Sequence, residues 1–496
     1  MKSKISIFAI IIFCFASFNN LLSNNLRLSN FNLHATDVDG LMIINIDTIS
    51  WDNSWRVDIP GSGYGIPHNH DAIWFFAKYK TANSDTWKPA KFHPNSGFHQ
   101  HSFDSEVKAV SDSMGLFVFR NSNVEGTNTF QHFEFAFNGR EIYQNLEDLQ
   151  FRIFAVEMVY IPVDDFWAGD GTTIDITGQF QGSDISPYHI VSEAQITLGG
   201  LSANSLNNRN ALGMASPDDF NNTTTKILPA EFPKGFNSVY CMKYEVTSQQ
   251  YVDFLNSLDT GQASERFANA FGTERNAIQK IGTKYFTTAP DRANNFMSWA
   301  DGAAYTDWCG LRPMTELEME KIARGPVIPV ANEYAWGNTT IVQAESIEGT
   351  DGSGTETTLP LNSNCNYNIF DGGTGQPIGG PVRVGIFANA TSDRTTSGSS
   401  YYGVMEMTGN VWERPVTVGN PAGRSFNALH GNGLVDAEGN ADVLNWPGID
   451  AVGSSFRMGN WFRSTQRARI SDRYYGATPL IDRTGHRGFR SVRTPN

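Results

Sequence analysis

Cysteine is scarce in this chain: the sequence holds 4 in 496 residues, and none lies after Cys365. Cys14 belongs to an apolar stretch at the N-terminus, which leaves Cys241, Cys309 and Cys365 for the rest of the chain. These thiols allow at most one internal disulfide and leave one cysteine over. A fold stapled by several disulfides is therefore excluded, while the pairing itself stays open.

Charge is also sparse, and basic charge is in deficit. Charged residues make up 18% of the chain, with 37 Lys and Arg against 51 Asp and Glu and a formal net charge of −14. This balance argues against nucleic acid or an anionic lipid surface as the main partner, because both attract basic proteins. It suits a secreted protein with a cation-binding surface.

Long apolar runs are confined to the N-terminus. Lys2 and Lys4 precede and flank the start of the run Ile5–Phe18, which predicts a secretory signal over residues 1–25 and a mature chain that is secreted, periplasmic or displayed at the cell surface. No later segment is apolar enough to be a transmembrane segment. Lipoprotein anchoring through Cys14 is the less favoured alternative, because Ile11–Phe13 lacks the small residues of such a cleavage site.

Aromatic residues (12%) and glycine (46 residues) are abundant, which favours a loop-rich fold over a helical bundle. A chain of this length is also too long for one ordinary core. From Leu41 to about Phe154, aromatic and β-branched runs such as Ala72–Ala77 and His132–Phe137 alternate with turn-forming clusters, and no helical window of useful length interrupts them. We therefore predict a β-sandwich domain over residues 35–154.

Histidines gather in this predicted sandwich, at His68, His70, His93, His99 and His101. Residues two apart on a strand share a face, so His99 and His101 are candidate ligands for Zn²⁺ or Cu²⁺. The alternative is a surface strand that tolerates histidine. We favour that alternative because no cysteine or suitably spaced carboxylate completes a metal site.

Helices are predicted in the second half of the chain by their N-terminal caps. Thr247–Gln250 is a capping box followed by an apolar stripe at helical spacing that ends at Leu258. A second helix begins at Ser298. A third begins at the capping box Thr315–Glu318 and ends at Gly325.

The stretch Tyr402–Arg414 is too irregular for an amphipathic helix or an alternating strand. Its glycines let the backbone turn, and Glu406 and Glu413 supply hard oxygens of the kind that bind Ca²⁺ together with backbone carbonyls. A glycine turn with solvated acids is the alternative explanation.

The same stretch contains Gly409–Glu413, which resembles the G-N-V-W-E signature of the formylglycine-generating enzyme (sulfatase-modifying factor) family. Further similar motifs are Met158–Pro162, Glu245–Thr247, Arg312–Glu320, Tyr334–Gly337, Arg457–Trp461 and Gly488–Arg490. The resemblance puts the family domain at residues 155–496. It implies an α+β, C-type-lectin-like fold with little regular secondary structure.

The resemblance also implies structural Ca²⁺. One ion would be held by the side chains of Glu406 and Glu413 with the carbonyl groups of Gly409 and Val411. A second would be held by the Asn366 side chain and the Tyr367 carbonyl group. The aspartate that completes this second site in the family has no equivalent here, because Asp371 lies too close along the chain.

Active members of the family are copper oxidases that use two cysteines near the C-terminus to convert a protein cysteine to formylglycine. Alignment on Gly459–Trp461 places Arg463 and Ala468 at those two positions. Neither a guanidinium nor a methyl group can offer copper the soft sulfur that it needs. We therefore expect no copper and no oxidase activity. An unrelated reaction in the same cavity is a further alternative.

Arginines are dense from Arg457 onward. We interpret Arg469, Arg473 and Arg490 as structural, because they fall where the family buries arginines in carboxylate networks. Arg463, Arg467 and Tyr474, with Trp461, remain as candidate ligand-binding residues, since arginine and aromatic side chains often dominate recognition surfaces.

The sequence thus predicts a secreted or cell-surface binding or assembly protein, whose partner is a peptide, a glycan or an envelope protein. The competing hypothesis is an oxidoreductase that converts a protein cysteine to formylglycine during sulfatase maturation.

Overall fold

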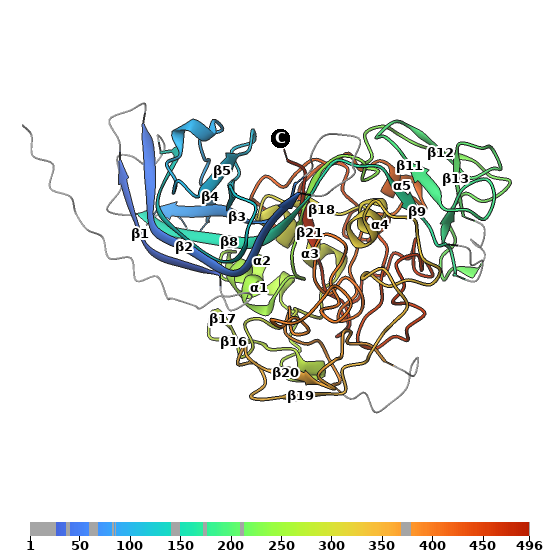
Figure 1. Ribbon diagram of the computed structural model, residues 1–496. Coiled ribbons are helices and arrows are strands. Elements are labelled where there is room, and N and C mark those ends of the chain that lie inside the picture. Colours follow the sequence, from blue (N-terminus) through green and yellow to red (C-terminus); the bar gives the residue numbers. More distant parts are fainter. Residues whose placement is uncertain are drawn as a thin grey trace, which may run out of the picture.

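The computed structural model describes residues 26–35, 40–58, 68–81, 84, 86–139, 149–171, 176–208, 213–368 and 378–495. The predicted signal segment 1–25 and Asp371 lie outside these residues. The N-terminal strands occupy one end of the molecule, and the longer remainder of the chain, with more loop than regular structure, forms the other (Figure 1).

Long antiparallel strands build the N-terminal part. One group is β1 (Arg27–Ala35), β2 (Leu41–Asp58) and β7 (Glu125–Asn138), with β1 and β7 both paired to β2. The other group is β3 (His68–Thr81), β6 (Leu116–Arg120) and β8 (Leu149–Ile161), with β6 and β8 both paired to β3. Shorter elements complete this part: β4 (Lys88–Pro89), the 3₁₀ turn η1 (Ser96–Phe98) and β5 (Ser105–Ala109).

The two groups of strands face each other across an apolar core. Ile44 and Ile46 of β2 pack in one cluster with Ile73 and Phe75 of β3. The ring centroids of Phe75 and Phe135, from opposite groups, lie 4.8 Å apart. Alternate apolar side chains, as read from the sequence, therefore point into this core.

Strand β8 joins the two parts of the molecule. Its last residues, Met158–Ile161, pair with β15 (Val239–Met242), and the sheet continues through β21 (Ser491–Arg493) to β18 (Arg312–Pro313). The position predicted as a domain boundary, between residues 154 and 155, lies inside this strand. The outer face of the N-terminal strands shares one apolar cluster with the helices, so Trp74 and Trp299 belong to the same core.

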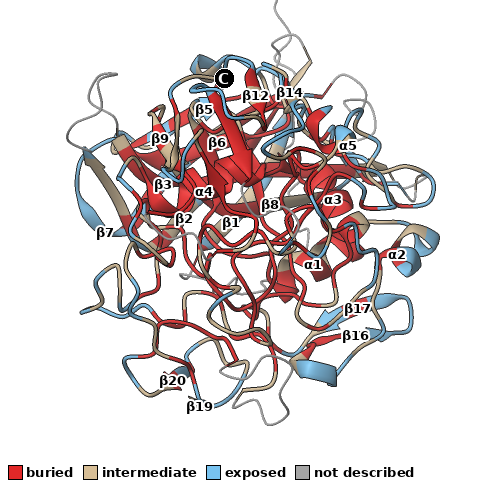
Figure 2. Ribbon diagram, turned by 90° about the vertical axis from the view of Figure 1, so that its right-hand side faces the viewer, coloured by how far each residue is buried: buried red, intermediate tan, exposed pale blue. Residues whose placement is uncertain are grey.

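The predicted helices α1 (Ser248–Leu255), α3 (Trp299–Trp308) and α4 (Glu316–Arg324) are present, and capping boxes begin them at Thr247, Ser298 and Thr315. Leu258 lies beyond the end of α1. A further capping box at Asp259 begins α2 (Thr260–Arg266), which the sequence analysis did not single out. Helix α4 is buried along its whole length (Figure 2).

The remaining elements are short: β9 (Phe166–Ala168), β10 (Phe180–Gln181), β11 (Tyr188–Ile190), β12 (Ile196–Leu198), β13 (Ser205–Asn208), β14 (Lys226–Leu228), η4 (Thr273–Arg275), β16 (Ile278–Ile281), β17 (Lys284–Thr287), β19 (Ser346–Glu348), β20 (Thr357–Leu359) and α5 (Pro421–Arg424). The fold therefore mixes helices and strands, as predicted.

Cys241, Cys309 and Cys365 are buried free thiols, so they form no disulfide with one another. In the part of the chain that the structure describes, no helix combines the length and apolarity needed to cross a membrane.

Candidate ligand and metal sites

The loop Tyr402–Arg414 runs through the interior, and its backbone explains its glycines. Gly409 has φ +88°, and a Cβ there would lie 2.5 Å from Cys365 Sγ and 2.7 Å from the Asn366 carbonyl oxygen. Asn410 also adopts a left-handed backbone conformation, with φ 53°. Only a glycine at position 409 fits so close to the segment Cys365–Asn366.

The two acids of the loop are buried, which rules out the solvated acids considered above. Glu406 and Glu413 are 3% and 1% exposed. The Glu406 carboxylate accepts a hydrogen bond from Gly385 N at 2.9 Å, and burial raises its pKa to about 7. The Glu413 carboxylate accepts one from Arg490 Nε at 2.6 Å, and burial raises its pKa as well.

A third carboxylate, Glu245, adjoins this loop and was not identified as a site residue from the sequence. Its oxygens accept hydrogen bonds from Asn410 Nδ2 at 2.5 Å and from Val411 N at 3.0 Å. Burial raises its pKa well above the usual range. The sequence could have pointed to Glu245, because this residue is the first of the E-V-T motif.

Several hard oxygen atoms on the loop remain unpartnered. Glu406 Oε2 and Glu413 Oε2 are buried and accept no hydrogen bond from any described residue. The carbonyl oxygens of Gly409 and Val411 likewise receive none from the described part of the chain. This donor set is of the type that Ca²⁺ prefers. Among the described residues, no three His, Cys, Asp or Glu side chains form a metal-binding group, so a cation here would depend on the carbonyl oxygens.

The residues proposed for a second ion are tied into the same region. Asn366 Nδ2 donates to the Gly380 carbonyl at 3.0 Å and to Asn410 Oδ1 at 3.2 Å. The Tyr367 carbonyl accepts a hydrogen bond from Gln343 Nε2 at 2.6 Å. The Tyr367 oxygen is thus already engaged, which distinguishes this position from the Glu406 and Glu413 oxygens.

Three of the four candidate ligand-binding residues lie together on the surface. The Arg467 guanidinium carbon lies 3.8 Å from the centroid of the Tyr474 ring, and the Tyr474 ring packs edge-on against Tyr475 at 4.7 Å. Arg463 lies 5.7 Å from the Tyr475 ring and 5.8 Å from the Phe462 ring. All five side chains are partly exposed. We call Phe462, Arg463, Arg467, Tyr474 and Tyr475 the aromatic–arginine stripe.

Trp461, the fourth candidate, lies beneath the stripe, and its ring packs edge-on against that of Phe462 at 5.7 Å. It is 4% exposed, belongs to an apolar cluster with Tyr244 and Val411, and donates from Nε1 to the Gly485 carbonyl at 2.8 Å. Trp461 is therefore buried in the interior, in contact with Phe462 of the stripe. Ala468, at the second copper position of the family, is likewise fully buried.

Two of the arginines interpreted as structural lie in buried carboxylate networks. Arg473 pairs with Glu316 at 2.7 Å and with Asp218 at 2.7 Å, and Arg490 pairs with Glu413. Arg469 is only partly buried.

In the histidine pair considered for Zn²⁺ or Cu²⁺, the His99 ring is hydrogen-bonded within the protein. His99 Nε2 hydrogen-bonds to the His93 carbonyl at 2.8 Å, and its Nδ1 accepts from Ala136 N at 3.2 Å. Both ring nitrogens of His99 are therefore occupied.

Comparisons with known proteins bear on these sites. Residues 218–495 match the family model of the sulfatase-modifying factor enzyme 1-like domain. A mouse (Mus musculus) protein described as "Inactive C-alpha-formylglycine-generating enzyme 2" is 29% identical over 147 residues, which is 29% of this chain and 39% of the mouse protein. The matched segment thus spans well under half of that relative. A solved structure, the Major Tropism Determinant U1 Variant, aligns with 68% of this chain and 82% of its own at 14% identity, with a TM-score of 0.23.

Proposed function

Because the chain belongs to the sulfatase-modifying factor enzyme 1-like family through residues 218–495, we propose that it is a non-catalytic binding or assembly protein built on that domain. The observation that carries the proposal is the absence of cysteine after Cys365, with Arg463 and Ala468 at the two copper positions. Thiolate is the ligand that holds Cu(I). A relative described as inactive supports the same conclusion.

Binding is proposed at the aromatic–arginine stripe, with Arg463, Arg467 and Tyr474 as the contacting residues and Trp461 as the packing support beneath them. Stacked arginine and tyrosine side chains combine a flat apolar surface with directed hydrogen-bond donors, as recognition surfaces commonly do. The partner is a peptide, a glycan or an envelope protein.

Calcium is proposed as a structural cofactor at the loop Tyr402–Arg414. Glu406 Oε2, Glu413 Oε2 and the carbonyl oxygens of Gly409 and Val411 fit it, because they are hard donors that accept no hydrogen bond from the described residues. The ion would supply positive charge to a buried acidic region. Glu413 also stays paired with Arg490, so this side chain orients the loop whether or not the ion is present.

The domain division belongs to the same proposal: a β-sandwich domain over residues 35–154 and a C-type-lectin-like domain over residues 155–496. The facing strand groups support the first, and the sparse regular structure of the remainder supports the second. The predicted signal segment places the mature protein outside the cytoplasm, either secreted, periplasmic or at the cell surface.

Incubation with a Cys-X-Pro-X-Arg peptide and Cu(I) tests the proposal directly. We expect the peptide mass to stay unchanged, with a catalytically active family member as the positive control. Oxidation of the peptide cysteine at turnover levels would instead establish the oxidoreductase hypothesis.

A further inference from the structure

A small pocket lies where β8, α1 and α3 meet, away from the aromatic–arginine stripe. Phe76, Phe154 and Trp308 line it with aromatic rings, and Gln250, Asp253 and Tyr305 line it with polar groups. Phe76, Tyr305 and Trp308 are buried, whereas Phe154, Gln250 and Asp253 are partly exposed. The pocket therefore has a buried aromatic floor and a partly exposed rim that carries a carboxylate.

The aromatic rings form a continuous wall. The Phe76 and Phe154 rings stack with centroids 5.1 Å apart, and the Trp308 ring packs edge-on against both, at 5.2 Å and 4.8 Å. Such a wall offers both apolar contact for methylene groups and the negative faces of the rings for a cation.

Two polar side chains of the pocket have hydrogen-bonding atoms without a partner among the described residues. The Asp253 carboxylate accepts one side-chain hydrogen bond, from Gln249 Nε2 to Oδ1 at 2.9 Å, and Oδ2 accepts none. The hydroxyl of Tyr305, a residue that is 1% exposed, makes no hydrogen bond with the described residues. Asp253 and Tyr305 line the same pocket. Burial is the main cause that raises the pKa of Tyr305, and the charges of Cys309 and Asp253 add to it. A carboxylate and a neutral phenol oxygen thus share one pocket.

Two cations around this pocket, Lys78 and Arg152, hydrogen-bond to other groups, although the charge of Arg152 also acts on Asp253. Lys78 donates to the carbonyl groups of Trp308 and Gly433. Arg152 donates to the Asn256 carbonyl at 3.0 Å and to Ser257 Oγ at 3.2 Å. Neither side chain hydrogen-bonds to Asp253.

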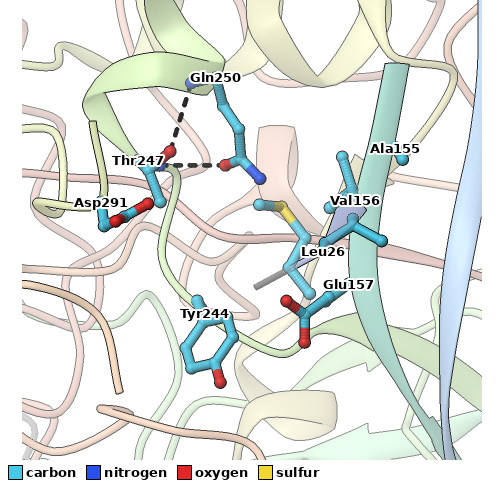
Figure 3. A pocket seen from close by; sticks show the side chains of 9 residues that line it. Leu26, Ala155, Val156, Glu157, Tyr244, Thr247, Gln250 and Asp291 are labelled. Atoms are coloured by element: carbon cyan, nitrogen blue, oxygen red, sulfur yellow. Dashed lines mark hydrogen bonds between the residues drawn. The ribbon is translucent and has the colours of Figure 1, made fainter. Parts of the chain in front are cut away.

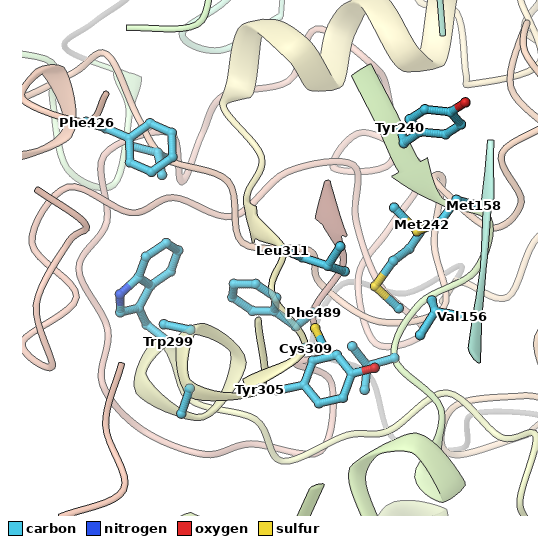
Figure 4. Packing of buried hydrophobic residues seen from close by; sticks show 14 of the residues in the cluster. Val156, Met158, Tyr240, Met242, Trp299, Tyr305, Cys309, Leu311, Phe426 and Phe489 are labelled. Atoms are coloured by element: carbon cyan, nitrogen blue, oxygen red, sulfur yellow. The ribbon is translucent and has the colours of Figure 1, made fainter. Parts of the chain in front are cut away.

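A second pocket adjoins the first and shares Ala155, Val156 and Gln250 with it. This second pocket is also lined by carboxylates. Glu157 and Asp291 line this second pocket (Figure 3). Glu157 is an ion-pair partner of Lys243 at 3.4 Å, and no lysine or arginine among the described residues lines either pocket. Tyr305 and Val156, which border the first pocket, belong to the apolar cluster shown in Figure 4.

We propose that this pocket binds a primary alkylammonium group, with the Asp253 carboxylate as its counter-ion, the Tyr305 oxygen as a further acceptor and the aromatic wall around its methylene groups. An ammonium donates several hydrogen bonds and carries one positive charge, which matches an unpaired carboxylate oxygen beside aromatic faces. The pocket is small, so it admits the end of an alkyl chain. A free amine and the side chain of a lysine on another protein both present this chemistry.

The test is a titration of the full mature chain with n-butylamine, followed by calorimetry or by protein fluorescence, at about pH 8, where the amine is protonated and a carboxylate is ionised. Saturable binding is expected, and n-butanol, which has the same chain without the charge, should bind at least tenfold more weakly. Equal binding of the alcohol, or no saturable binding of the amine, would overturn the proposal.

Variants locate the binding. Asp253→Asn keeps an acceptor for Gln249 but removes the charge, and we expect it to weaken amine binding at least tenfold, while Glu348→Gln on the exposed strand β19 leaves binding unchanged. Tyr305→Phe, which keeps the ring, should weaken binding severalfold and serves if Asp253→Asn does not fold. Unchanged affinity in the folded variants would refute the assignment.

N-acetyl-lysine methylamide separates the two sources of the ammonium group. Affinity equal to that of n-butylamine identifies a protein lysine as a fitting ligand, and affinity at least tenfold weaker identifies a free amine. These results do not depend on the oxidase assay or on the stripe, so the proposed function and this site fail or succeed separately.

Discussion

The Glu413 carboxylate accepts a hydrogen bond from Arg490 Nε at 2.6 Å through Oε1, while its Oε2 is buried and accepts none. One oxygen therefore fixes the loop to the closing Gly488–Arg490 segment, and the other has no hydrogen-bond partner among the described residues. A buried carboxylate oxygen without a partner is costly, and a hard cation is the natural partner for it.

This arrangement predicts that Ca²⁺ stabilises the folded protein. Adding Ca²⁺ at about 100 times its dissociation constant should raise the free energy of unfolding by about 3 kcal/mol, because only the folded state brings these oxygens together. Chelator should lower the melting temperature of the wild type accordingly. Thermal melts with and without chelator measure the difference.

Glu406→Gln is the matched variant for the calcium prediction. It keeps an acceptor for Gly385 N, removes one hard ligand charge and leaves the Glu413–Arg490 pair intact. We expect its melting temperature to be insensitive to chelator, whereas Glu348→Gln behaves like the wild type. A chelator effect that persists in Glu406→Gln would rule out this loop as the calcium site.

The carboxylate of Glu316 anchors a buried network at the start of α4. It pairs with Arg473 at 2.7 Å and with Arg457 at 2.9 Å, and it accepts from Val418 N at 2.8 Å. Glu316→Gln removes the charge that both arginines share, so the free energy of unfolding should fall by about 3–5 kcal/mol. Urea denaturation measures this loss. The control Asp219→Asn weakens a partly exposed pair with Arg424 and should cost far less, so equal losses in the two variants would contradict the network's role.

The features that the sequence predicted are mostly local. The capping boxes at Thr247, Ser298 and Thr315 join residues three apart, so their chemistry is visible in the chain itself. The strands of the N-terminal part are likewise visible as aromatic and β-branched runs.

Features that depend on distant residues were less visible. Glu245 reaches Asn410 across 165 positions, and the pocket with Asp253 exists only because β8, α1 and α3 meet. Trp461 shows the same limit, since its motif identified it as a candidate for binding, and its burial in the folded protein was not visible in the sequence. Burial depends on the folded structure, so it cannot be read from the composition of the sequence or from the spacing of its residues.

His70 is predicted to destabilise the protein in acid. It is stacked between Phe119 and Tyr160, at 4.5 Å and 4.8 Å, and burial lowers its pKa from 6.5 to about 3. Below pH 6.5 the unfolded chain therefore binds a proton at this residue and the folded chain does not, so stability falls as the pH falls. The loss attributable to His70 reaches about 4 kcal/mol near pH 3.

The pH dependence of His70→Phe measures this contribution. The variant keeps an aromatic ring in the stack and loses the titration, so its free energy of unfolding should fall less steeply than that of the wild type between about pH 6.5 and 3. His34→Gln, at an exposed position on β1, should retain the wild-type slope. Parallel curves for wild type and His70→Phe would show that His70 is not buried in its neutral form.

The aromatic–arginine stripe predicts a loss of binding in a protein that still folds. Arg463 and Arg467 are partly exposed, and Arg467 forms an ion pair at 2.8 Å with the buried Asp472 carboxylate. Replacing both with serine should lower the free energy of unfolding by about 1–3 kcal/mol, because the Asp472 side chain is only 5% exposed and loses its ion-pair partner. Capture of the proposed peptide, glycan or envelope partner by the immobilised protein should fall at least tenfold. The wild-type interaction should weaken as salt rises, since the guanidinium groups contribute charge. Lys88→Ser, an exposed change on β4, controls for the loss of one positive charge. Retained capture by the doubly substituted protein would place the recognition surface elsewhere on the molecule, because the stripe would then lack both of its cations and still bind.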